Sequence, residues 1–192
     1  MDFNTGLSFV AAGVTIAVIA VSIYRGPRSF VQGIFAAGMT LLAIEAALTG
    51  FAYHTAALSD FLFWQRQLYI VSSIVPAVWL MFAISFSRTN YSEQISRWKW
   101  VLLLAAAAPL SLVIFFSQDF ISLVLAPHDS NTLFIRIGWA GYLWHLLSVI
   151  ISIAVVMNLE RTFRHSTGHI RWQTKFMFLG IGGIFAIRLF TD

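Results

Sequence analysis

The chain has 192 residues, of which 59% are hydrophobic and only 10% are charged, and its formal net charge is +4. Because a soluble domain carries about 25% charged residues, this composition excludes an ordinary soluble protein and is typical of a membrane protein. The sequence contains no cysteine, which excludes disulfides and cysteine nucleophiles.

Six stretches of the sequence are long and apolar enough to cross a bilayer, which requires roughly 20 residues for a helix. In chain order, the predicted spans are 7–24, 30–53, 61–86, 100–117, 138–159 and 174–190. The first span is expected to be a retained helix, because Asp2 precedes it without any cation, whereas a secretory signal begins with positive charge. The sequence therefore predicts an all-α transmembrane bundle of six helices, forming a single domain over residues 1–192.

The loop between the fourth and fifth spans, residues 118–137, has a pattern of its own. Two runs rich in β-branched residues, 120–126 and 132–137, flank a turn-forming Pro-His-Asp-Ser-Asn segment. We expect a small β-hairpin that lies over the outer mouth of the bundle. The alternative is an irregular loop or an interfacial helix.

Positive charge is concentrated in the loops after the first, third and fifth spans. These loops and the first turn of the sixth span hold nine of the 12 Lys and Arg residues: Arg25, Arg28, Arg88, Arg97, Lys99, Arg161, Arg164, Arg171 and Lys175. Cytoplasmic loops retain cations, so the pattern predicts an N-terminus outside the cytoplasm and gives no indication of a nucleic-acid partner. Five tryptophans near the predicted span ends are expected to be interfacial anchors: Trp98, Trp100, Trp139, Trp144 and Trp172.

Four ionisable residues lie more than one residue inside the ends of predicted spans, where charge is costly and therefore marks a candidate functional site. They are Glu45, Arg66, His145 and Arg188, which come from four different helices at a similar depth in the outer half of the bundle. One interpretation is a ligand pocket in which Arg66 or Arg188 binds an anion. The other is a structural ion pair between Glu45 and an arginine, with Arg66 extending to the membrane surface.

The sequence contains no pattern that indicates catalysis or a bound cofactor. Neither an H-E-x-x-H zinc motif nor a G-x-S-x-G elbow is present, and no span carries a pair of carboxylates or a central lysine. His165 and His169 are spaced as metal ligands on a helix would be, but the adjacent cations Arg164 and Arg171 disfavour a metal ion. We therefore expect this chain to have no catalytic residues, no metal site and no cofactor.

Two segments near the end of the chain carry a family resemblance. Residues 158–180, NLERTFRHSTGHIRWQTKFMFLG, and 184–192, IFAIRLFTD, resemble the membrane domain of PrsK-type sensor histidine kinases of the exosortase/PEP-CTERM systems. Residues 86–90, FSRTN, are similar to the same group. The broader resemblance is to the seven-helix N-terminal region of histidine kinases.

This resemblance implies the signal-input domain of a two-component sensor kinase in the bacterial inner membrane, with a periplasmic N-terminus. It implies a homodimer in contact with membrane lipids, an envelope, lipid or exopolysaccharide-related cue, and a response regulator reached through cytoplasmic kinase modules. Such modules are missing from these residues, and six spans would place Asp192 outside. We therefore expect the chain to be a piece of a longer protein, with a domain of seven or more helices. The alternative function is that of a small transporter or permease subunit, which would need a polar path across the midplane.

Overall fold

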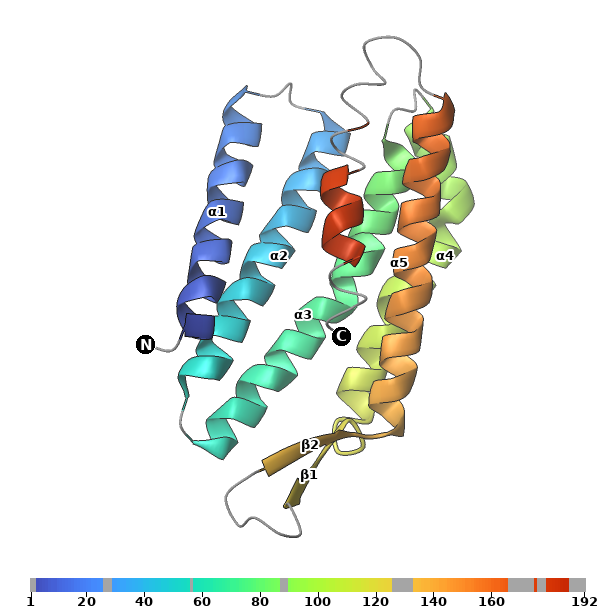
Figure 1. Ribbon diagram of the computed structural model, residues 1–192. Coiled ribbons are helices and arrows are strands. Elements are labelled where there is room, and N and C mark those ends of the chain that lie inside the picture. The colour runs from blue at the N-terminus through green and yellow to red at the C-terminus, as the bar shows by residue number, and fades with distance from the viewer. Residues whose placement is uncertain are drawn as a thin grey trace.

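The computed structural model describes residues 3–25, 29–55, 57–86, 90–125, 133–165, 175 and 179–186. Five helices are long and apolar enough to cross a membrane. They are α1 (Phe3–Arg25), α2 (Phe30–His54), α3 (Leu58–Ser85), α4 (Tyr91–Phe115) and α5 (Trp139–His165). The helices stand side by side, and successive helices from α1 to α4 run in opposite directions (Figure 1). The protein is a multi-pass helical bundle, as the apolar stretches predict.

Two helices extend well beyond their predicted spans. Helix α4 begins at Tyr91 rather than at residue 100, and α5 continues to His165 rather than ending at 159. The added turns are polar and charged, so they lie outside the apolar stretches by which spans are recognised. In α5 the extension is supported by a hydrogen-bonded pair one turn apart, in which Arg164 donates to Glu160 at 2.5 Å. Hydropathy thus marks the lipid-immersed part of each helix and not the whole helix.

Helix α3 occupies the centre of the bundle and packs against α2, α4 and α5, whereas α1 packs against α2. The larger core cluster is built mainly on α3 and includes Trp79, Phe82 and Ile84. Ile181 and Phe185, from the helical residues 179–186, also belong to this cluster. These residues lie within the predicted sixth span, of which the structure describes only 175 and 179–186.

Strands β1 (Ile121–Leu125) and β2 (Leu133–Ile137) pair in antiparallel register within the predicted hairpin segment, with Leu123 opposite Ile135. The turn predicted between them lies outside the described residues. The two strands lie at one end of the bundle, which we call the hairpin end (Figure 1). The start of α1 and the connection from α2 to α3 lie toward the same end.

Candidate functional site

Two neighbouring serines on α3 connect it to two different helices. Ser72 donates a hydrogen bond to the Glu45 carboxylate on α2. Ser73 accepts a hydrogen bond of 2.7 Å from the indole Nε1 of Trp144 on α5 and donates one of 2.7 Å to the Tyr69 carbonyl. Consecutive residues of an α-helix point about 100° apart, so adjacent positions can reach two different neighbouring helices. The serine pair, Ser72 and Ser73, therefore ties α2, α3 and α5 together.

The burial of these hydroxyls follows from local helix chemistry. A hydroxyl has one donor and two acceptor positions, and Ser73 fills the donor position within its own helix and an acceptor position across the interface. Pro76 lies four residues after Ser72 and has no backbone N–H, so the Ser72 carbonyl loses its usual helical partner. The interhelical hydrogen bonds of Ser72 and Ser73 thus lie where the α3 backbone lacks one of its own hydrogen bonds.

Three aromatic rings lie just below the serine pair, toward the hairpin end. The ring centroid of Tyr69 is 4.8 Å from that of Phe120 and 5.2 Å from that of Trp144, both in edge-to-face geometry. Trp144 and Phe120 belong to a second buried cluster, together with Val113 and Ala140. The prediction that Trp144 is an interfacial anchor is wrong, because its side chain is only 2% exposed. The indole is buried where Ser73 satisfies its N–H.

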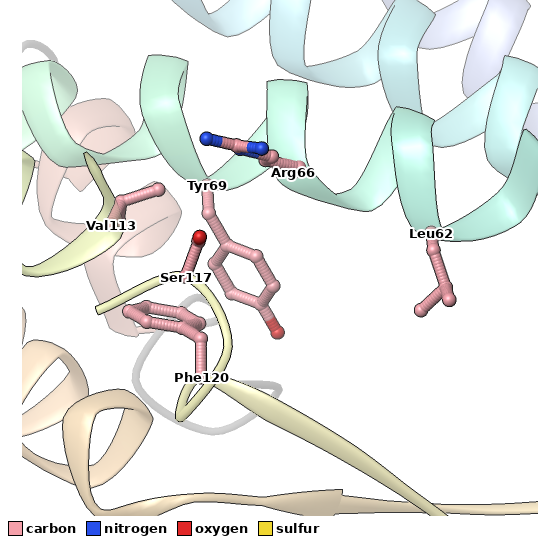
Figure 2. A pocket seen from close by; sticks show the side chains of 6 residues that line it. All are labelled: Leu62, Arg66, Tyr69, Val113, Ser117 and Phe120. Carbon is pink, nitrogen blue, oxygen red and sulfur yellow. The ribbon is translucent and has the colours of Figure 1, made fainter. Parts of the chain in front are cut away.

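A cavity of about 190 Å³ opens beside this aromatic cluster. Six described residues line it: Leu62, Arg66 and Tyr69 from α3, Val113 from α4, and Ser117 and Phe120 from the turn that follows α4. In Figure 2 the Ser117 hydroxyl points toward the side of the cavity where the Arg66 guanidinium lies, and Leu62 lies further along α3. The cavity is therefore lined by one cationic side chain, a serine hydroxyl, and aliphatic and aromatic side chains.

A glycine at the start of α5 determines where Phe120 lies. The amide of Gly138 donates a hydrogen bond of 3.1 Å to the Phe120 carbonyl. A Cβ atom at Gly138 would lie 1.9 Å from the backbone oxygen of Asp119, which no side chain tolerates. This close approach of two backbones fixes the turn and, with it, one surface of the cavity.

The helix bounds put Glu45, Arg66 and His145 at comparable depths. Glu45 is nine residues before the end of α2, Arg66 eight after the start of α3 and His145 six after the start of α5. At about 1.5 Å per residue these positions are roughly 9 to 14 Å from the hairpin-end terminus of each helix. Of these three, Arg66 lines the cavity, Glu45 is bonded to Ser72, and the His145 ring contacts that of Trp144. The fourth candidate, Arg188, lies outside the described residues.

Sequence reasoning from charge alone missed Tyr69, the serine pair, Phe120 and Trp144. A signal for part of this set was present, because a buried tryptophan needs an acceptor for its indole N–H. Ser73 on α3 is such an acceptor, but its pairing with Trp144 spans 71 positions of sequence. Spacing along one helix does not reveal such a contact.

The apolar helices define a multi-pass membrane protein, and its cavity lies beside the aromatic cluster toward the hairpin end. Residues 7–190 match the family model described as the N-terminal 7TM region of histidine kinase, and the chain belongs to that family. It is therefore a sensory, non-catalytic membrane region of the two-component type. Neither a curated protein nor a solved structure matches the chain.

Proposed function

We propose that this domain receives a signal at the hairpin end and relays it, through α3 and α5, to kinase modules on the cytoplasmic side. The observation that carries this proposal is the serine pair. It links α3, which lines the cavity, to both α2 and α5. A molecule that changes the position of α3 at the cavity would therefore bias the packing of both neighbours. Such a bias between two helix arrangements is how a ligand changes the output of a receptor.

The distribution of cations supports an orientation with the hairpin end outside the cytoplasm. Arg97 and Lys99 lie near the start of α4, and Arg161 and Arg164 near the end of α5. These helix ends lie away from the hairpin (Figure 1). Under the positive-inside rule, such an end faces the cytoplasm. The N-terminus, at the hairpin end, would then be periplasmic in a bacterial inner membrane.

The finer assignment follows the resemblance described from the sequence. We propose a PrsK-type sensor of the PEP-CTERM systems that responds to an envelope, lipid or exopolysaccharide-related cue. In the full-length protein it would act as a homodimer and transfer phosphate to a response regulator.

Basal autophosphorylation of the full-length protein in lipid nanodiscs tests the relay. Ser73→Ala removes the acceptor for Trp144 and is expected to change the phosphorylation level by several-fold. Ser8→Ala in α1 is the matched control, because the Ser8 hydroxyl donates only to the Asn4 carbonyl of its own helix, at 2.9 Å. Equal phosphorylation in the two variants and the wild type would contradict the proposal.

A further inference from the structure

We propose that the cavity at the hairpin end binds the oxyanion head of an amphiphile, a phosphate or carboxylate group carried on an apolar chain. This inference rests on the proposed function only in so far as the bound molecule acts as the signal. The binding itself depends on the six residues that line the cavity, and it can be measured without any kinase output.

Charge in the cavity favours an anion. Arg66 is the only charged residue among the six that line it, and none of the six is acidic. In the part of the chain that the structure describes, Arg66 forms no ion pair. Its planar guanidinium can donate two parallel hydrogen bonds to a phosphate or a carboxylate. The Ser117 hydroxyl, on the same side of the cavity, adds a further donor.

Depth in the membrane favours a lipid-like molecule. Helix α3 has 28 residues and is therefore about 42 Å long, against about 30 Å of hydrocarbon. Arg66 lies eight residues from its hairpin-end terminus, or roughly 12 Å along the axis. If α3 is centred in the bilayer, Arg66 lies a few ångströms inside the hydrocarbon boundary, where an amphiphile's head and chain meet.

The size and composition of the cavity favour a head group attached to an apolar chain. Leu62, Val113 and the rings of Tyr69 and Phe120 give the cavity apolar surface beside these polar groups. A volume of about 190 Å³ is below the roughly 300–1,000 Å³ that encloses a drug-sized ligand. The cavity therefore accommodates the head and its first carbons. The side chain of Arg66 is exposed, which leaves an open side through which the rest of the chain would reach the lipid.

Native mass spectrometry of the full-length protein, released from phosphatidylcholine nanodiscs, provides the test. The probes are dodecyl phosphate, dodecanoate, dodecanol and inorganic phosphate. We expect both anionic amphiphiles to bind at least about tenfold more tightly than dodecanol, because a hydrogen bond to a charged group is worth about that factor or more. Inorganic phosphate, which lacks a chain, should bind more weakly than dodecyl phosphate. Equal affinity for dodecanol and dodecyl phosphate would overturn the anion assignment, and equal affinity for inorganic phosphate would overturn the amphiphile assignment.

Three variants separate the cavity from the rest of the surface. Arg66→Gln should weaken dodecyl phosphate binding by about tenfold or more, whereas Arg66→Lys should retain part of the affinity because it keeps the charge. Arg97→Gln makes the same change in charge on an exposed residue near the start of α4, away from the cavity, and should leave binding unchanged. Similar losses in Arg66→Gln and Arg97→Gln would overturn the proposal. Matching unfolding midpoints establish that Arg66→Gln is folded.

Nanodiscs that contain phosphatidylglycerol distinguish the source of the anion. If a bilayer lipid supplies the head group, phosphatidylglycerol remains bound to the wild type, is lost in Arg66→Gln and competes with dodecyl phosphate. If the source is a free amphiphile, dodecyl phosphate binds equally in both kinds of nanodisc. Arg66-dependent binding without an effect on autophosphorylation would refute the signalling role and leave the site intact. If Ser73→Ala changes autophosphorylation but no binding depends on Arg66, the proposed binding site is refuted and the relay through α3 and α5 still stands.

Discussion

Helices α1 and α3 have nearly the same hydropathy and very different environments. The mean hydropathy of the most apolar window is 2.3 in α1 and 2.0 in α3, yet 6% of that window is buried within the protein in α1 and 61% in α3. In a bilayer, lipid is as apolar as a protein core, so hydropathy selects the spans and does not rank them by burial. Helix α3 is the more buried of the two because it packs against α2, α4 and α5, whereas α1 packs against α2.

The largest expected contrast is between isoleucines in the two helices. Ile84 in α3 is 1% exposed and Ile16 in α1 is 58% exposed. Ile84→Ala should lower the free energy of unfolding by about 2 kcal/mol, because it leaves a cavity among packed side chains. Ile16→Ala should change it by less than about 0.5 kcal/mol, because lipid fills the space. Unfolding by sodium dodecyl sulfate measures both, and equal losses would refute the central position of α3.

A smaller contrast is expected between serines of the two helices. Ser73→Ala should cost about 1 kcal/mol, because the buried Trp144 N–H loses its acceptor. Ser8→Ala in α1 should be close to neutral, since only a bond within the helix is lost. A double-mutant cycle of Ser73→Ala with Trp144→Phe isolates the interaction. If the two substitutions are additive, the hydrogen bond does not hold α3 to α5.

The smallest expected contrast is between two Gly→Ala substitutions, which should change the free energy of unfolding in opposite directions. A Cβ atom at Gly13 in α1 would meet no described atom within 4 Å, whereas one at Gly38 in α2 would lie 3.0 Å from the Trp79 ring of α3. Gly13→Ala should raise the unfolding free energy by up to about 1 kcal/mol through helix propensity. Gly38→Ala should lower it, because the buried Trp79 ring has little room to shift. The midpoint of unfolding should therefore move in opposite directions, and a shared direction would contradict the packing of α2 on α3.

Much of the fold follows from the sequence, because the bilayer imposes a strong rule on helix length. The first five predicted spans correspond to α1–α5, and Gly138 lies where α5 begins. The extra turns of α4 and α5 were missed because they are polar and lie outside the apolar windows. The paired strands lie within the two runs rich in β-branched residues, and the turn predicted between them lies outside the described residues.

The candidate site was only partly predictable. Arg66 was identified from the cost of charge in a membrane, and it does line a cavity. Its neighbours Tyr69, Ser117 and Phe120 are ordinary residues whose importance comes from the meeting of α3 with the turn after α4. The bond between Ser73 and Trp144 depends on two helices being adjacent, which a single sequence does not encode in any local spacing. The cost of charge in a membrane identified Arg66, whereas the other residues of the site are brought together by the packing of the helices.

The measurement that tests the account most directly is autophosphorylation of the full-length protein, in phosphatidylcholine nanodiscs, during a titration with dodecyl phosphate. We expect the probe to change the phosphorylation level of the wild type and of Arg97→Gln at the same concentration. Arg66→Gln should need about tenfold more probe for the same change. An identical response in Arg66→Gln and Arg97→Gln, or no response of the wild type to a probe that binds it, would contradict the claim that the signal enters beside α3.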